Sequence, residues 1–201
     1  LLQGPFGEDG SIQGMLEMAG VSYVGSGIAA SAMGMDKHYM KVVFEGAGFK
    51  VGPYEVITNK QWLRDSEAAM KRCENLQYPL FVKPARAGSS VGITKVDDPS
   101  ELRAAIEIAR AEDPKVIIEQ GIVGREIECG VLEGRGSGPS RASLPGEIAV
   151  ADNLHTFYDF EAKYVDGAAA ELSCPANLSD EATREIRELA VKAFDAIDAE
   201  G

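Results

Sequence analysis

The sequence has 201 residues, of which 45% are hydrophobic and 26% are charged, a composition typical of a globular protein with a sizeable core. Its 32 acidic residues outnumber its 20 lysines and arginines, and the formal net charge of -12 argues against nucleic-acid binding, because contact with a phosphate backbone requires excess positive charge. No signal peptide is visible, and no apolar run approaches the roughly 20 residues of a membrane span. Three widely spaced cysteines without a CxxC pair indicate free thiols in a reducing cytoplasm, not a zinc site.

The first part of the chain predicts two helices. One is expected from Ser11, with apolar residues at helical spacing on one face. The other is expected over residues 36–47, because apolar residues recur there with the same period and Gly48 is a good stop signal. Between them, residues 23–24 are interpreted as a short strand that precedes a glycine turn.

The middle of the chain predicts a hairpin followed by a helix. Residues 80–83 have the pattern of a buried strand, residues 88–90 that of a tight turn, and residues 91–96 that of the return strand. Asp98 opens the next helix with a capping box. The apolar face expected for this helix consists of Leu102, Ala105, Ile106 and Ala109.

The last third predicts strands over residues 116–119 and 127–132, an exposed hairpin or loop over residues 133–145, and a long loop over residues 151–167. A loop of that length favours a functional lid over a connector. Ser179 then caps a final helix, whose core-facing residues are expected to be Ile186, Leu189, Ala190, Ala193, Phe194 and Ile197. The strand–turn–strand units predict antiparallel pairing, and therefore an α+β or mixed α/β fold.

The strongest local signal is a lysine followed at once by a Gly/Ser-rich turn, FVKPARAGSSVG at residues 81–92. Lys83 ends a buried strand, and buried lysines are rare unless they are paired, so an anionic partner is expected. A Gly/Ser loop can surround phosphate oxygens with backbone amides and hydroxyl groups, although the order of lysine and loop differs from the Walker motif. The residues leave two interpretations open: a phosphate site, or a hairpin with a structural Lys–Glu pair.

Three segments resemble, in the same order, segments of the D-alanine–D-alanine ligases. GEDGSIQGMLEMAGVSYVGSGIAASAMGMDKHYMK at residues 7–41 resembles the entry into the family's ATP-binding domain. FVKPARAGSSVGITKV at residues 81–96 resembles its phosphate-binding hairpin, and FYDFEAKY at residues 157–164 resembles the flexible loop over its active site. The resemblance covers nearly the whole chain. It implies an ATP-grasp fold, in which two α+β subdomains with antiparallel sheets hold ATP, here in incomplete form.

The resemblance also implies roles for individual residues. Lys37 and Lys83 match two phosphate-contacting lysines, and Ser89 and Ser90 match the turn over the phosphates. On the residues alone, Lys37 has the alternative of a solvated helix lysine.

A further segment, VIIEQGIVGREIECGVL at residues 116–132, resembles the family's hinge and adenosine pocket. Glu119 would lie beside the adenine amino group or accept a hydrogen bond from it. Gln120 and Ile122 would offer backbone groups to the adenine edge, and Glu126 would bind the ribose hydroxyls. On spacing alone, both glutamates could be ordinary surface charges.

In the long loop, Lys163 matches a residue that reaches the terminal phosphate on closure, and Tyr164 matches one that joins Ser89 in a hydrogen-bonded closure network near the first substrate. Ser89, Lys163 and Tyr164 are therefore the expected catalytic residues. An acyl-phosphate intermediate requires such a lid, because water would hydrolyse it in an open site. The alternative for this segment is a tyrosine-rich edge strand. Glu8, in the GEDG motif, is the expected substrate-pocket residue at the other end, where Gln3 stands in place of the histidine usual in the family.

By resemblance, residues 1–36 end an N-terminal substrate-side domain, residues 37–125 form the central ATP-binding subdomain, and residues 126–201 begin the C-terminal subdomain with its lid loop. The family's Mg²⁺ ligands are expected in a C-terminal stretch outside these residues, so no residue is assigned to a metal. These residues alone are expected to be inactive.

The implied function is ATP-dependent joining of two D-alanines through an acyl phosphate, for peptidoglycan synthesis in the cytoplasm. The expected partners are D-alanine and ATP, with a homodimer at full length and neither nucleic acid nor membrane. Two alternatives stay open: a ligase with a D-lactate or D-serine acceptor, and a non-catalytic nucleotide-binding protein.

Overall fold

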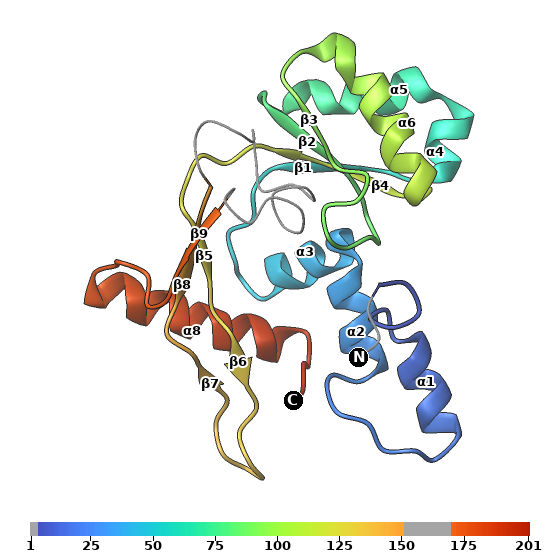
Figure 1. Cartoon of the computed structure of the whole chain (residues 1–201). Coiled ribbons are helices and arrows are strands. Elements are labelled where there is room, and N and C mark those ends of the chain that lie inside the picture. The colour runs from blue at the N-terminus through green and yellow to red at the C-terminus, as the bar shows by residue number, and fades with distance from the viewer. Residues whose placement is uncertain (1–3, 151–169) are drawn as a thin grey trace. The chain divides into compact units, whose positions relative to one another are not determined.

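The computed structural model describes residues 4–150 and 170–201. The chain divides into two compact units, one of residues 33–123 and the other of residues 1–32 together with 124–201 (Figure 1). The domain boundaries expected from the family resemblance stay a prediction.

The unit of residues 33–123 is built on a four-stranded sheet with the order β1-β4-β2-β3. Every neighbouring pair is antiparallel, as the strand–turn–strand pattern predicted. Phe81 lies opposite Glu119, and Lys83 lies opposite Ile117. The strands are β1 (Tyr54–Ile57), β4 (Val116–Gln120), β2 (Leu80–Pro84) and β3 (Thr94–Val96).

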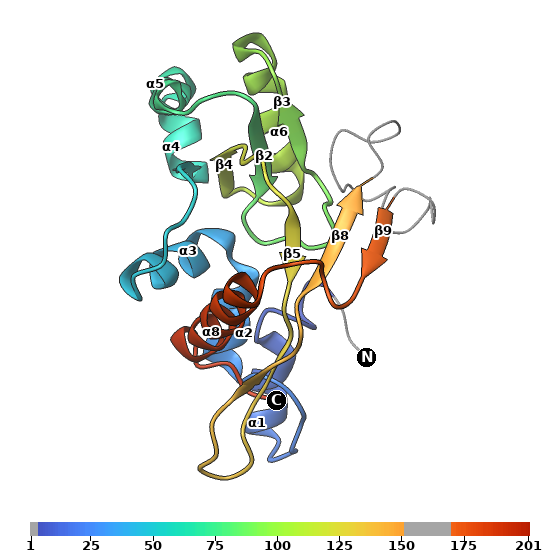
Figure 2. The same cartoon turned by 90° about the vertical axis from the view of Figure 1, so that its left-hand side faces the viewer.

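Helix α6 (Leu102–Glu112) packs on β2, β3 and β4 (Figure 1, Figure 2). The predicted capping box is present in the short 3-10 turn Pro99–Glu101 that leads into α6, between Asp98 and Glu101. All four residues predicted for the apolar face of α6 are buried. They form one hydrophobic core with alternate residues of β2 and β4 and with residues of two short helices, α4 (Asn59–Arg64) and α5 (Ser66–Arg72). The strands and short helices contribute Leu80, Val82, Val116, Ile118, Trp62 and Ala69 to this core.

Strand alternation turns the remaining side chains of β2 and β4 to the other face of the sheet. On β2, Lys83 alternates with the buried Val82, and on β4, Glu119 alternates with the buried Ile118. Helix α3 (Lys37–Gly46) supplies a lysine that reaches Glu119. Its caps at Asp36 and Ala47 confirm the helix predicted over residues 36–47.

The other unit contains helix α1 (Ser11–Met18) and the start of α2 (Ile28–Met35). A three-stranded antiparallel sheet has the order β5-β8-β9, with β5 (Glu126–Glu128), β8 (Gly146–Val150) and β9 (Ala170–Ser173). Strands β6 (Val131–Leu132) and β7 (Arg141–Ala142) form a hairpin; β7 lies in the region predicted as a hairpin or loop, whereas β6 lies just before it. The last helix, α8 (Asp180–Ala196), is capped by Ser179 as predicted.

Several expectations are wrong. Residues 23–24 form no strand, since they pair with no other strand. The strand expected over residues 127–132 is broken, because the chain changes partner there from β8 to β7. The return strand expected over residues 91–96 is limited to β3, because left-handed residues in the preceding turn delay the pairing.

The face of α8 that was expected to point into the core is not buried. No residue of α8 is buried, and Leu189 is 43% exposed. Helical periodicity identified the apolar stripe but not whether another element covers it.

Candidate functional site

Two lysines bind a single glutamate on the face of the sheet away from the core. The Nζ atom of Lys41 lies 2.6 Å from Oε1 of Glu119, and the Nζ atom of Lys83 lies 2.5 Å from Oε2. The three side chains are only 15%, 25% and 16% exposed, for Lys41, Lys83 and Glu119. Burial by itself would raise the pKa of Glu119, but Lys83 and Lys41 together hold that pKa below its ordinary value.

Lys37 lies beside this pair at the first position of α3. Its backbone N–H donates to the carbonyl of Ala85 at 3.0 Å, and its Nζ atom donates to the carbonyls of Pro84 at 3.2 Å and Ala87 at 2.5 Å. Burial, and then the charge of Lys83, lower the pKa of Lys37. The structure therefore brings together the two lysines that the resemblance assigned to phosphate contact, at the end of β2.

The start of α3 is fixed by a buried ion pair. Asp36 is 4% exposed, and its Oδ1 accepts the backbone N–H groups of His38 and Tyr39. Both oxygens of the same carboxylate accept from Nζ of Lys115, at 2.8 and 2.9 Å. A buried carboxylate is stable only with such partners, so this pair sets where Lys37 begins the helix.

The loop after β2 is anchored at its second residue, Arg86. Arg86 donates from its Nε and Nη2 atoms to both oxygens of Asp113, which is 3% exposed, and its backbone N–H donates to the same carboxylate. Ser89 and Ser90 follow with φ of 51° and 58°, left-handed conformations that are uncommon for residues other than glycine. Strained backbone of this kind clusters at ligand-binding loops, and turns with successive left-handed residues can direct backbone amides toward an anion.

Gln120 and Ile122 continue from β4 along the same edge. The side chain of Gln120 accepts the backbone N–H of Gln77 at 3.0 Å, and its own N–H donates to the carbonyl of Pro53. Ile122 is 76% exposed and lies against Gly52, where an added Cβ atom would be 2.8 Å from its Cδ1 atom. The hydrogen bonds thus fix the chain at Gln120, whereas the side chain of Ile122 is largely exposed.

The remaining predicted site residues belong to the other unit or lie outside the described residues. Glu8 accepts the backbone N–H of Gly4 at 2.7 Å in the other unit, and Glu126 is an exposed residue of β5 in that unit. Lys163 and Tyr164 lie outside the described residues. The roles of these four residues stay predictions.

Sequence reasoning missed Lys41. It follows Lys37 by four residues on the same helix, and residues at this spacing share a helix face. That spacing was the available signal, but the partner, Glu119, is 78 residues away and is identified only by the fold. The resemblance placed Glu119 near adenine, whereas in this structure both of its carboxylate oxygens are engaged by lysines.

Within residues 4–150 and 170–201, no group of three or more His, Cys, Asp or Glu side chains could hold a metal ion. No helix in the described part of the chain is long and apolar enough to cross a membrane.

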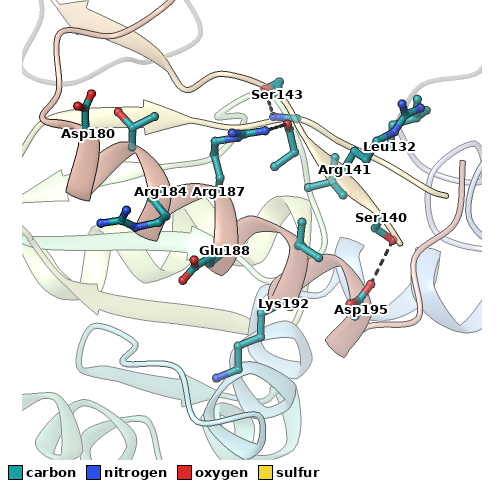
Figure 3. Close-up of a pocket in the computed structure, with 15 residues that line it drawn as sticks. Leu132, Ser140, Arg141, Ser143, Asp180, Arg184, Arg187, Glu188, Lys192 and Asp195 are labelled. Atoms are coloured by element: carbon teal, nitrogen blue, oxygen red, sulfur yellow. Dashed lines mark hydrogen bonds between the residues drawn. The ribbon is translucent and has the colours of Figure 1, made fainter. Parts of the chain in front are cut away.

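A cavity of about 1260 Å³ lies between α8 and the β6–β7 hairpin (Figure 3). Arg187 crosses it to donate to the carbonyl of Ala142 at 3.0 Å, and Ser140 bonds Asp195. Its lining mixes apolar side chains with charges of both signs and includes none of the predicted site residues. The size of a cavity alone does not identify a functional site. The lysine cluster is the better candidate because several charged side chains lie close together there.

A family model and curated relatives match this chain. The family model described as "D-ala D-ala ligase C-terminus" matches residues 43–201. The whole chain is 66% identical to D-alanine–D-alanine ligase of Arthrobacter sp. (strain FB24) and 63% identical to that of Pseudarthrobacter chlorophenolicus, in each case over 53% of the relative's length. The chain thus spans about half the length of the curated relatives it matches.

Two solved structures are similar in fold. The VanG D-Ala:D-Ser ligase from Enterococcus faecalis matches with a TM-score of 0.85 and 39% identity, over 99% of this chain and 55% of that one. The D-alanine–D-alanine ligase from Coxiella burnetii matches with a TM-score of 0.78 and 32% identity, over 98% of this chain and 50% of that one. Together with the antiparallel α+β architecture, these matches confirm the expected fold class: the chain belongs to the D-alanine–D-alanine ligase family and has part of an ATP-grasp fold.

Proposed function

We propose that the full-length protein joins two D-alanines in an ATP-dependent reaction. The observation that carries the proposal is the pairing of Lys41 and Lys83 with Glu119, with Lys37 next to them and a Ser/Gly loop after Lys83, in a chain of this ligase family. Three cations around one carboxylate leave an excess of positive charge, which favours an anion such as a polyphosphate.

In the proposed reaction, a carboxylate oxygen of the first D-alanine attacks the terminal phosphorus of ATP, and ADP leaves. The amine of the second D-alanine then attacks the acyl carbon, loses a proton, and displaces inorganic phosphate. Lys37 and Lys83 bind phosphate oxygens, and their charges offset those of the triphosphate. Ser89 and Ser90 place the turn above the phosphates.

The adenosine part of ATP is assigned to the segment after β4. Glu119, Gln120 and Ile122 border the adenine, and Glu126 binds the ribose. Lys163 and Tyr164 close over the reacting groups and exclude water, with Ser89 as the partner of Tyr164. These assignments rest on motif resemblance and on the family membership of the chain.

Mg²⁺ is assigned to residues beyond this chain, where it would neutralise charge on the phosphates when bound. We assign the full-length protein to the cytoplasm and expect it to be a homodimer that acts on small molecules.

A D-serine acceptor is the second candidate, because the VanG structure that resembles this chain is named as a D-Ala:D-Ser ligase. The relatives at 66% and 63% identity are named D-alanine–D-alanine ligases, which favours D-alanine. Mixed-acceptor assays, with product identification by mass spectrometry, separate the two.

The experiment is phosphate release by the full-length protein with ATP, Mg²⁺ and D-alanine. We expect release to depend on D-alanine and to fall at least about 100-fold in Lys83→Ala. The exposed Lys60, on α4, gives the matched control Lys60→Ala, which should release phosphate at the wild-type rate. Absence of D-alanine-dependent release by the wild-type protein would overturn the proposed function.

A further inference from the structure

Lys41 is the lysine of the cluster to which the family resemblance assigns no role. It lies one helical turn after Lys37 on α3, and its side chain is 15% exposed. Its Nζ atom is 2.6 Å from Oε1 of Glu119 and 5.3 Å from the ring centroid of Tyr54. Lys41 is therefore enclosed between a carboxylate and an aromatic face, in a position that favours a fixed ammonium group.

Among residues 4–150 and 170–201, the ion-pair partners of Glu119 are Lys41 and Lys83. Asp36 is paired with Lys115, and Asp113 is paired with Arg86, so these two nearby carboxylates are already neutralised. Glu119 is thus the carboxylate that pairs with Lys41 and Lys83, and Lys37 lies close enough to interact with its charge. The three lysines outnumber the one carboxylate, so the cluster has an excess of positive charge that favours binding of an anionic ligand.

The two ion pairs of Glu119 differ in one respect that matters for binding. Lys83 is 25% exposed and stands at the end of β2, directly before the Ser/Gly loop, whereas Lys41 is 15% exposed and covered by Tyr54. A phosphate oxygen that binds Lys83 competes with Oε2 of Glu119 for the charge of its Nζ atom. A carboxylate that is only 16% exposed is costly without a cation, so a second partner must remain.

Resting on the function proposed above, we propose that Lys41 is a positioning residue of the nucleotide site. It holds Glu119 charged and in place, so that Lys83 can exchange the Glu119 carboxylate for a phosphate oxygen of ATP. Without Lys41, Glu119 retains Lys83 as its sole counterion. The nucleotide must then compete with Glu119 for Lys83, and its affinity falls.

Calorimetric titration of the full-length protein with Mg²⁺ and a non-hydrolysable ATP analogue tests this role. We expect Lys41→Met to weaken binding about tenfold, as for loss of a charged hydrogen bond. Lys41→Arg restores the charge and should bind within about threefold of wild type, a difference below about 0.7 kcal/mol. The exposed Lys60→Met is the matched control and should bind as the wild type does.

The deciding comparison uses Glu119→Gln. This variant removes the carboxylate that traps Lys83, so Lys41→Met should have less than a twofold effect in the Glu119→Gln background. An equal loss in both backgrounds would show that Lys41 acts on the nucleotide itself or on folding, and would overturn the proposal. Unchanged affinity in Lys41→Met would overturn it as well.

Failure of the proposed function has a different signature. If the wild-type protein does not bind the analogue, that function falls, and this proposal falls with it. If the wild type binds and only the Lys41 comparisons fail, the function stands. Melting curves of every variant check the fold, and Lys41→Gln, with the same expected loss, replaces Lys41→Met if the latter unfolds.

Discussion

The two units of the chain bury their apolar side chains to very different extents. In the unit of residues 33–123, Ile57, Leu80 and Ile106 are completely shielded from solvent, within one core that reaches from the sheet to α6. Among the described residues of the other unit, the buried apolar side chains are those of Ala30, Pro145 and Ala176, and α8 has no buried residue. The first unit thus offers a rigid support, while the second exposes much of its apolar surface.

This difference in burial indicates which of the two candidate regions can hold functional side chains in fixed positions. Lys83 and Glu119 stand on the two central strands of the well-packed sheet, so their backbone positions are fixed by the core behind them. The large cavity of the other unit lies between a hairpin and a helix that has no buried residue. Precise placement of binding groups requires a rigid support, which favours the lysine cluster.

Cysteine labelling gives the largest expected contrast between the units. Cys73 is buried, and burial raises the pKa of its thiol to about 11, whereas Cys174 is exposed. Alkylation requires an accessible thiolate, so Cys174 should react at least about a thousandfold faster at pH 8, because Cys73 reacts only after local unfolding. Mass spectrometry of iodoacetamide-treated full-length protein measures both rates. Comparable rates would show that the core of residues 33–123 opens readily, which would contradict the difference in burial between the two units.

Truncation of apolar side chains sharpens the same comparison. Ile106→Ala removes a fully buried side chain and should lower the local unfolding free energy of residues 33–123 by about 4 kcal/mol. Leu189→Ala, at a position that is 43% exposed, should change the stability around α8 by no more than about 0.5 kcal/mol. Hydrogen exchange of both segments provides the two values, and similar losses would contradict the account.

The ion pairs of the two units should differ in the same direction. Asp36→Asn leaves Lys115 without its buried counterion and should destabilise the 33–123 unit by about 3 kcal/mol. Arg125→Ala breaks the pair with Glu147 in the other unit, where the arginine side chain is 48% exposed, and should change thermal stability little. Thermal melts followed by circular dichroism measure both. A larger loss from Arg125→Ala would reverse the ranking.

Acid gives the smallest expected effect, and it should appear in the 33–123 unit. Glu119 has a folded-state pKa below its ordinary value of 4.5, so its contribution is complete above that pH and is lost as the pH falls through the folded-state pKa. The protection of β4 amides, measured as the ratio of the intrinsic to the observed exchange rate at each pH, should therefore fall at acid pH in the wild type. The same dependence should be weaker in Glu119→Gln, and identical profiles would show that the Glu119 pairs add no stability.

Local signals accounted for much of the fold. The capping box at Asp98 and the helical period after it correctly identified α6 and its buried face, because both depend on neighbours in the sequence. The strand β1 and the short helices α4 and α5 were missed, since four to seven residues carry too little periodicity. The prediction that one face of α8 is buried was wrong, because burial depends on which other element covers a helix.

The candidate site, like the fold, could be predicted only where the signal is local in the sequence. Lys83 and the loop after it carried a local pattern, and the resemblance added Lys37. The pairing of Lys41 and Lys83 with Glu119 depends on strand register, in which Phe81 lies opposite Glu119, and no local pattern encodes that register.

The most direct test of the central claim compares the two candidate regions in one experiment. Hydrogen exchange of the full-length protein is measured with and without a non-hydrolysable ATP analogue and Mg²⁺. The account predicts slower exchange at residues 36–41 and 84–93, around the lysine cluster and the loop after β2. Slower exchange only at residues 130–143 and 180–195, which line the large cavity, would contradict it.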